Sequence, residues 1–204
     1  MKSAMPYLGI RMPNLKRVHR SLLKAHPLTS EAEFAACLRE LWDDATFREE
    51  RYTALALVER YPQWVTLELL ERLIVEGAWW DLVDTLARRV GDLLRRDASV
   101  AGAMRRWSVD PNRWKRRVSI ICQLGFRGDT DLELLYVCIE PNLADREFFV
   151  RKAIGWALRE YAWHDPAEVD RYVRAHADSL SGLSRREATK NLEKLLADPS
   201  RRRR

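Results

Sequence analysis

The chain of 204 residues is rich in apolar and charged side chains, with 47% hydrophobic residues, 32% charged residues and a net charge of +6. Eight glycines and eight prolines are few enough to favour helices over a β-sandwich or barrel, and no apolar stretch is long enough for a membrane span or a signal peptide. The three cysteines and four histidines lack the spacing of a disulfide framework or a metal site, so we expect a cytoplasmic protein with no metal and no cofactor.

Helical periodicity runs through nearly the whole sequence, and no segment reads convincingly as a strand. Ser, Thr, Asp and Asn residues stand before the apolar repeats as helix caps, and Pro and Gly residues follow them as helix ends. We expect helices over 14–23, 30–42, 47–59, 66–77, 80–90, 91–106, 113–122, 131–137, 146–161, 165–173 and 184–196. These helices form a single domain over 1–198, and a basic tail follows over 199–204.

Four of the expected helices share a period of about 33 residues. Each carries a charged residue three positions before an apolar or small one, and the charged residues are Arg51, Asp84, Arg117 and Lys152. This period is the length of a repeat built from two or three helices. We therefore predict an all-α superhelix, a solenoid of the HEAT or armadillo kind, whose concave face carries this mainly basic row.

The stretch 76–84, Glu-Gly-Ala-Trp-Trp-Asp-Leu-Val-Asp, sets two indoles beside two carboxylates after a glycine. Trp80 and Asp84 are four residues apart, so their side chains lie on one face of a helix, one turn from each other. A ring face and an anion both attract positive charge, which suits a reaction that builds a cation. The stretch also fits an ordinary helix start, in which Gly77 ends one helix and Asp81 caps the next.

Arginine makes up 29 of the 36 basic residues. Its guanidinium group forms forked bonds to phosphate and stacks on flat rings, so an arginine-rich basic chain is a candidate for nucleic-acid binding. A well-solvated surface encoded by a GC-rich genome would have the same composition. Charge alone does not separate these two explanations.

Four runs, spread in order over nearly the whole chain, carry a resemblance to a known family. They are Tyr-Leu-Gly-Ile-Arg-Met-Pro at 7–13, Trp-Trp-Asp-Leu-Val-Asp at 79–84, Trp-Lys-Arg-Arg-Val-Ser-Ile at 114–120, and the run 148–161. Together they resemble the AlkD-like DNA alkylation repair glycosylases, which are HEAT-like-repeat proteins. The resemblance implies excision of N3- and N7-alkylated purines, such as 3-methyladenine and 7-methylguanine, from duplex DNA without base flipping.

By position, the resemblance implies that Asp84 is the catalytic carboxylate and that Trp80 and Trp156 flank the sugar and backbone of the damaged nucleotide. It also implies a phosphate contact for Arg117 and a second one for Arg159. Most glycosidases need two carboxylates, but a cationic alkylpurine leaves as a neutral base and needs no general acid. One carboxylate is then enough to stabilise the sugar cation and to position a water molecule.

Further basic residues are expected to contact the phosphates of double-stranded DNA. The full expected set is Lys16 in the first helix and Lys115, Arg116, Arg117, Arg151, Lys152 and Arg159 in two helices one repeat apart. Such contacts give affinity without sequence preference and a steep dependence on salt. For any one of them the alternative is a solvated surface charge, although Arg117 and Lys152 are favoured by their place on the periodic row. We expect the protein to act as a monomer.

The chain departs from the family pattern at two places. Only six residues precede Tyr7, where family members usually carry a further helix with an aromatic residue that touches DNA, and Gly125 replaces a basic residue. Both departures bear on affinity and footprint more than on chemistry. Two other functions remain open, a non-catalytic protein that binds DNA structures with the same fold, and an α-solenoid scaffold that binds another protein.

Overall fold

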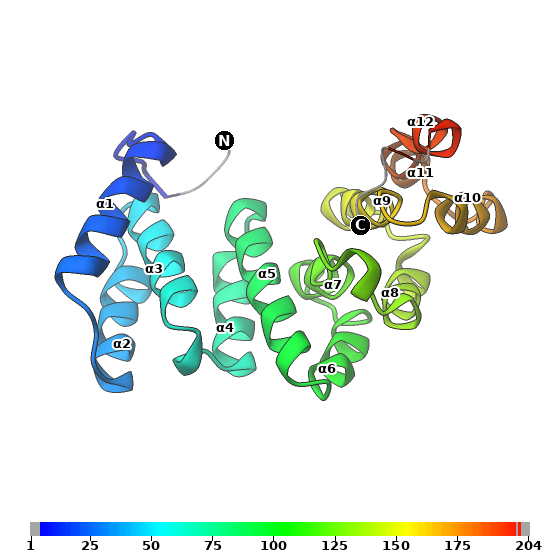
Figure 1. Ribbon diagram of the computed structural model, residues 1–204. Coiled ribbons are helices and arrows are strands. Elements are labelled where there is room, and N and C mark those ends of the chain that lie inside the picture. The colour runs from blue at the N-terminus through cyan, green and yellow to red at the C-terminus, as the bar shows by residue number, and fades with distance from the viewer. Residues whose placement is uncertain (1–4, 199, 201–204) are drawn as a thin grey trace. The chain divides into compact units, whose positions relative to one another are not determined.

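The computed structural model describes residues 5–198 and residue 200. Helices make up 72% of the chain, and no strand is present among the described residues, which confirms the all-α prediction. The α-helices, shown in Figure 1, are α1 (Met12–Ala25), α2 (Glu31–Leu38), α3 (Arg48–Arg60), α4 (Leu67–Gly77), α5 (Trp80–Arg96), α6 (Val100–Trp107), α7 (Arg113–Ile121), α8 (Leu132–Ile139), α9 (Phe148–Tyr161), α10 (Pro166–Ala175), α11 (Gly182–Thr189) and α12 (Leu192–Ala197). The predicted basic tail lies, apart from Ser200, outside the described residues.

Contacts within the chain divide it into two compact units, residues 1–70 and residues 71–204. In the first unit α1 and α2 pack against α3, and in the second unit α5, α7, α9 and α11 form a layer in which each helix packs against the next. The helices α6, α8 and α10 cover this layer, which gives the second unit the paired stacking of a helical solenoid (Figure 1). The single domain over 1–198 stays a prediction.

Hydrogen bonds between successive helix pairs confirm the predicted period. Arg117 on α7 binds Asp84 on α5, 33 residues earlier in the chain. The Ser184 hydroxyl group on α11 donates to the carbonyl oxygen of Arg151 on α9 at 3.0 Å, again across 33 residues. Equivalent positions of neighbouring repeats in the second unit therefore lie side by side, as the predicted row requires.

The predicted helix boundary at Gly91 is wrong, because α5 continues through this residue to Arg96. A Cβ atom at Gly91 would lie 2.2 Å from the carbonyl oxygen of Cys122, so the glycine allows the chain at the end of α7 to approach α5 closely. The predicted last helix, 184–196, is also wrong in extent, since α11 and α12 are two separate helices. At Gly91, therefore, the glycine is present because of a close packing contact and does not end the helix.

Several predicted helix starts are confirmed by side-chain caps. The side chains of Asn112, Asp131 and Asp165 accept hydrogen bonds from backbone amides in the first turns of α7, α8 and α10. The first helix differs from its prediction, because α1 begins before Asn14 and holds Pro13 in its first turn, where the missing N–H group of proline costs nothing. None of the described helices is both long and apolar enough to cross a membrane.

Candidate functional site

Trp80 and Asp84 lie in the first turns of α5. Before this helix, Ala78 has a positive φ angle of +35°, and Trp79 is extended just before the first turn. Leu82 and its apolar neighbours on α5 are fully buried, which leaves Trp80 exposed by 40% and the Asp84 side chain by 17%. The amphipathic pattern of α5 thus anchors one face in the core and presents an indole and a carboxylate, one turn apart, on the other.

Asp81 does not cap α5 as predicted. It lies inside the first turn, where its Oδ1 atom accepts a hydrogen bond from the amide of Leu82 at 2.8 Å. Trp79 occupies the capping position and makes no side-chain capping bond. The acidic side chain still suits the positive end of the helix dipole, because it stands in the first turn.

Asp84 is held by a forked ion pair from Arg117 on the neighbouring helix α7. The Arg117 Nε atom donates to Oδ1 of Asp84 at 2.7 Å, and Nη2 donates to Oδ2 at 2.8 Å. The third nitrogen, Nη1, donates to the carbonyl oxygen of Phe149 at 2.6 Å. Arg117 is only 4% exposed, so this guanidinium group is fixed on three sides and in turn fixes the plane of the carboxylate.

Trp156 on α9 completes the group of predicted catalytic residues. Its ring centroid lies 5.9 Å from the guanidinium carbon of Arg117, a distance at which a cation and an aromatic face attract each other. The structure therefore links Asp84, Arg117 and Trp156 through direct contacts, and Trp80 shares the exposed face of α5 with Asp84. Three helices in consecutive positions of one layer supply this site.

An aromatic cluster stands behind the ion pair. The ring of Phe149 lies 4.9 Å from that of Trp114 and 5.7 Å from that of Trp79, measured between centroids. Trp79, at the extended capping position, thus packs against other rings, whereas Trp80 in the first turn of α5 is 40% exposed. The cluster holds the backbone of Phe149, whose carbonyl oxygen binds Arg117. This backbone role has no side-chain signature, so sequence reasoning missed it.

The predicted phosphate-binding residues of α7 are paired with carboxylates in the structure. Lys115 binds Glu71, with 2.6 Å between its Nζ atom and Oε1, and also binds Asp110. Arg116 binds Asp145, with 3.0 Å between the paired atoms. Burial lowers the pKa of Lys115, but its bonds to Asp110 and Glu71 outweigh this effect and raise the pKa above its ordinary value.

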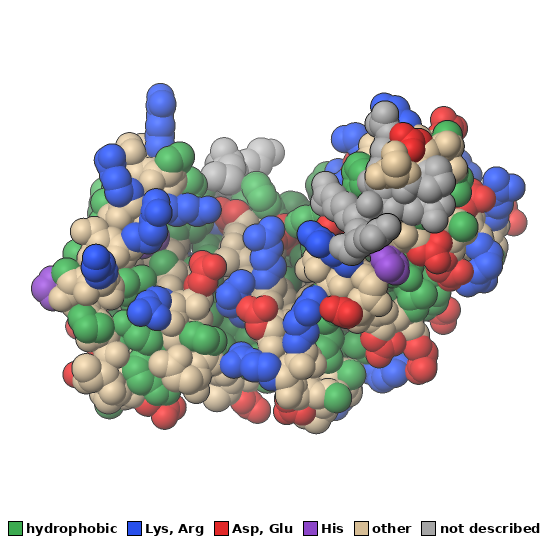
Figure 2. All heavy atoms as spheres, viewed as in Figure 1, with side chains coloured by type: hydrophobic (Ala, Val, Ile, Leu, Met, Phe, Trp, Pro, Cys, Tyr) green, Lys and Arg blue, Asp and Glu red, His purple; other side chains and the backbone are tan. Residues whose placement is uncertain are grey.

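On α9, Lys152 and Arg159 both bind one carboxylate, Glu187 of α11, with 2.8 Å between Lys152 Nζ and Glu187 Oε1. The bond from Lys152 is the main reason why the pKa of Glu187 is lowered. Arg151 directly precedes Lys152 on α9, and its Nε atom is buried without a hydrogen-bond partner among the described residues. Lys16 lies on α1 in the first unit. Figure 2 shows acidic side chains interspersed with Lys and Arg on the visible face.

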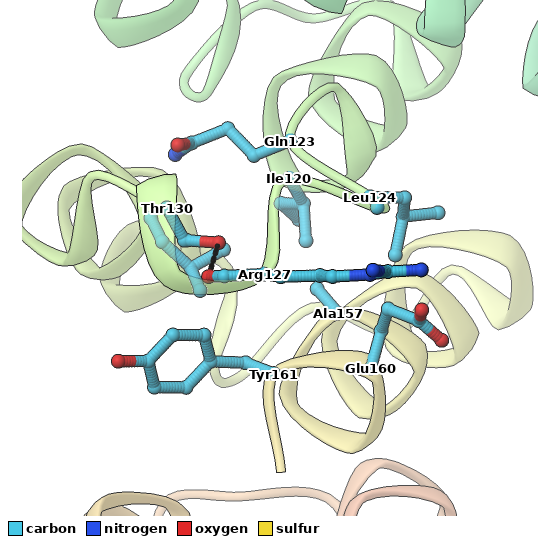
Figure 3. A pocket seen from close by; sticks show the side chains of 10 residues that line it. Ile120, Gln123, Leu124, Arg127, Thr130, Ala157, Glu160 and Tyr161 are labelled. Carbon is cyan, nitrogen blue, oxygen red and sulfur yellow. Dashed lines mark hydrogen bonds between the residues drawn. The ribbon is translucent and has the colours of Figure 1, made fainter. Parts of the chain in front are cut away.

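Gly125 lies at the edge of a small cavity of about 10 Å³, which is enough for about one water molecule. Its φ angle of +86° favours glycine at this position, because other residues are strained in this conformation. In Figure 3 the side chain of Arg127 extends past Ala157 toward Glu160 of α9. The chain thus offers an arginine two positions after the one that was expected to be basic.

Comparisons with known proteins agree with this arrangement. The family model described as DNA alkylation repair enzyme matches residues 1–192, so the chain belongs to this family. Among solved structures, it is similar to a predicted DNA alkylation repair enzyme from Enterococcus faecalis, with 28% sequence identity and a TM-score of 0.83 over 93% of this chain and 90% of that one. A search of the curated proteins finds no match. Membership in the family supports a role in the repair of alkylated DNA and therefore DNA as a binding partner.

Proposed function

We propose that the protein is a DNA glycosylase that hydrolyses the N-glycosidic bond of cationic N3- and N7-alkylpurines in duplex DNA. The observation that carries this proposal is the partly exposed carboxylate of Asp84, oriented by the fork of Arg117 and accompanied by Trp80 and Trp156. We expect it to act as a monomer in the cytoplasm.

The chemistry needs only this one carboxylate. An alkylated purine with a positive charge leaves as a neutral base, so no acid has to protonate it. Each oxygen of Asp84 accepts one bond from Arg117 and keeps further acceptor capacity, with which it can hold a water molecule or face the sugar cation. Each indole face that meets the developing charge contributes roughly 0.5–2 kcal/mol, depending on how far water is excluded.

The exposure of the site supports excision without base flipping. Most glycosylases rotate the damaged base into an enclosed pocket. Here Trp80 is 40% exposed and Asp84 stands beside it on the helix surface, so both side chains are accessible to a nucleotide that stays in the duplex. In this arrangement the carboxylate of Asp84 would face the sugar of the nucleotide.

The deciding experiment measures release of 7-methylguanine from methylated duplex DNA by the native protein and by Asp84→Asn. We expect the substitution to slow release roughly 100- to 1000-fold, because one preorganised charge is lost, while duplex affinity stays nearly the same. Release at the native rate would remove Asp84 from its role. Absence of release by the native protein, with salt-sensitive duplex binding retained, would indicate the non-catalytic alternative, and absence of binding would indicate a protein scaffold.

A further inference from the structure

The aromatic cluster of Trp79, Trp114 and Phe149 joins the starts of the three neighbouring helices that supply the candidate site (Figure 1). Trp79 lies directly before α5, Trp114 in the first turn of α7 and Phe149 in the first turn of α9, at equal intervals along the chain. Each ring contacts the other two, because the centroids of Trp79 and Trp114 also lie within 6.5 Å. The cluster therefore ties together equivalent places of three successive repeats.

Two side chains nearer to the solvent pack on this cluster. The guanidinium carbon of Arg113 lies 5.3 Å from the ring centroid of Trp114, and Arg113 also binds Glu147, directly before α9, at 3.2 Å. The ring of Phe148, which is 52% exposed, stands edge-on to that of Phe149 at 5.3 Å between centroids. Trp114 itself is only 3% exposed, so its ring has little room to move.

Phe149 connects the cluster to Arg117, because one residue carries both the ring and the carbonyl group that matter. Its ring belongs to the cluster, and its carbonyl oxygen accepts the bond from Arg117 Nη1 at 2.6 Å. A carbonyl oxygen has two lone pairs, so it can accept this bond and still serve its own helix. Trp114 precedes Arg117 by one turn of α7, so the cluster also holds the helix on which the guanidinium group stands.

The bond to the Phe149 carbonyl affects Asp84 through the rigid, planar guanidinium group of Arg117. Nη1 binds the carbonyl on α9, while Nε and Nη2 bind the two carboxylate oxygens on α5. If the carbonyl moved away, Nη1 would be a buried donor without an acceptor, which is unfavourable enough to make the group turn toward a new one. Any such turn changes the fork that fixes the plane of the Asp84 carboxylate.

We propose that Trp79, Trp114 and Phe149 are positioning residues for the reaction at Asp84. Their packing fixes the carbonyl group of Phe149, this carbonyl fixes Arg117, and Arg117 orients the carboxylate. The role does not require that any of the three rings touches the nucleotide. The inference rests on the proposed function for the reaction that Asp84 serves.

The test removes one ring from the cluster of the full chain and compares the result with the loss of a ring elsewhere. Phe149→Leu keeps an apolar side chain and the backbone carbonyl group. Tyr172→Leu is the matched control, because Tyr172 is a buried ring of α10, stacked on Tyr136 and His176 at 4.3 and 4.1 Å between centroids, and α10 supplies no residue of the site. Single-turnover release of 7-methylguanine and affinity for an undamaged duplex are measured for both variants, each with and without Arg117→Lys.

We expect Phe149→Leu to slow release roughly 10- to 100-fold with little change in duplex affinity, because a shift of about 1 Å in a catalytic group has an effect of this size. Tyr172→Leu should release the base like the native protein. In the Arg117→Lys background Phe149→Leu should slow release little further, since both substitutions disturb the same group. Slowing by the same factor in both backgrounds, or equal slowing by Tyr172→Leu, would overturn the proposal.

Two substitutions at Trp79 keep the test decisive if Phe149→Leu does not fold, which thermal melting checks. Trp79→Leu removes a half-buried ring and should slow release through Arg117 in the same way. Trp79→Phe keeps a ring and should retain release, because the indole Nε1 atom has no hydrogen-bond partner among the described residues. Equal rates for these two variants would contradict a role for the ring.

A second measurement does not depend on catalysis. The Nε–H group of Arg117 is nearly buried and bonded to Asp84, so its proton should exchange slowly with water in a proton–nitrogen NMR spectrum, where Arg117→Lys identifies its signal. Phe149→Leu should speed this exchange roughly tenfold or more and Tyr172→Leu should not. Equal exchange in the native protein and Phe149→Leu would overturn the proposal. If the native protein released no base, the proposed function would fail, and the exchange would still decide whether the cluster holds Arg117.

Discussion

At the scale of single residues, the sequence leaves two roles open for Arg117, which could bind a DNA phosphate or orient Asp84. The geometry of its guanidinium group distinguishes them. A phosphate contact requires guanidinium nitrogens that face solvent, whereas three nitrogens of Arg117 bind Asp84 and the Phe149 carbonyl and the residue is 4% exposed. In the proposed reaction, the carboxylate of Asp84 has to keep a fixed orientation toward the sugar, and this requires a residue that holds it. We therefore assign to Arg117 mainly the orientation of Asp84.

This assignment predicts the effect of Arg117→Lys. A lysine keeps the charge but cannot bridge both oxygens of Asp84 and the carbonyl of Phe149 at once. We expect base release under single-turnover conditions to slow about 100-fold, as follows when a catalytic group shifts by about 1 Å, with a smaller change in duplex affinity. If the variant lost affinity more than rate, Arg117 would be a phosphate contact instead.

Glu187 is the second residue with a clear prediction. It neutralises Lys152 and Arg159, which are both expected to contact DNA. Glu187→Gln should free the two cations, tighten duplex binding and steepen its salt dependence by about 0.9 in slope for each new phosphate contact. Glu193→Gln on α12 is the control, because it removes the same charge from an exposed position. Unchanged binding by Glu187→Gln would show that these two cations do not reach DNA.

At the scale of secondary-structure elements, the site depends on how closely α5 and α7 approach each other. Asp84 comes from α5 and Arg117 from α7, so the ion pair forms only at one distance between the two helices. Gly91 sets this distance further along α5, where a side chain would collide with the Cys122 carbonyl. Helix α5 thus carries both the carboxylate that we propose to be catalytic and the glycine that allows α7 to approach it.

Gly91→Ala should therefore destabilise the protein, although alanine is the better helix former. The added Cβ atom would stand 2.2 Å from a backbone oxygen that cannot move alone, and overpacking of this kind costs about 1–3 kcal/mol. Gly102→Ala on α6 is the matched control, since its nearest neighbour would be the Arg106 side chain at 3.6 Å, and it should stabilise by up to about 1 kcal/mol. Thermal or urea unfolding measures both changes, and equal stabilities would contradict the close approach.

At the scale of the whole molecule, the pH dependence of stability follows from its carboxyl groups. Six of them in the described part have a lowered pKa, namely Glu33, Glu49, Asp97, Asp110, Glu168 and Glu187. A carboxyl group whose pKa is lower in the folded state than in the unfolded state stabilises the fold above its unfolded pKa. This contribution is lost as the pH falls through the folded value, so the protein should become less stable in acid.

Glu49 offers a test of this behaviour. Burial raises its pKa, but hydrogen bonds from the amides of Leu8 and Ile10, at 3.0 and 3.2 Å, contribute to a net lowering. Below its ordinary pKa of 4.5 the native protein should lose stability more steeply than Glu49→Gln, which has no proton to bind. Melting temperatures at several pH values from 7 to 3 measure the difference, and parallel curves would show that Glu49 does not contribute.

The sequence by itself was sufficient for the fold class, the period and part of the site, because these depend on local spacing. Helical periodicity predicts the all-α fold, the caps at Asn112, Asp131 and Asp165 mark helix starts, and the interval of four residues puts Trp80 and Asp84 on one face. The period of about 33 residues also predicts that Arg117 stands beside Asp84.

Only the tertiary structure decides what depends on contacts between helices. The carbonyl oxygen of Phe149 has no side-chain signal, and Glu187 can be matched to Lys152 and Arg159 only when α9 and α11 are in place. The conformational preference of glycine predicts a boundary between two helices at Gly91, yet this residue lies inside α5, where it packs closely against the Cys122 carbonyl. Sequence patterns describe the residues of one helix, whereas an ion pair or a close approach depends on the relative position of two helices.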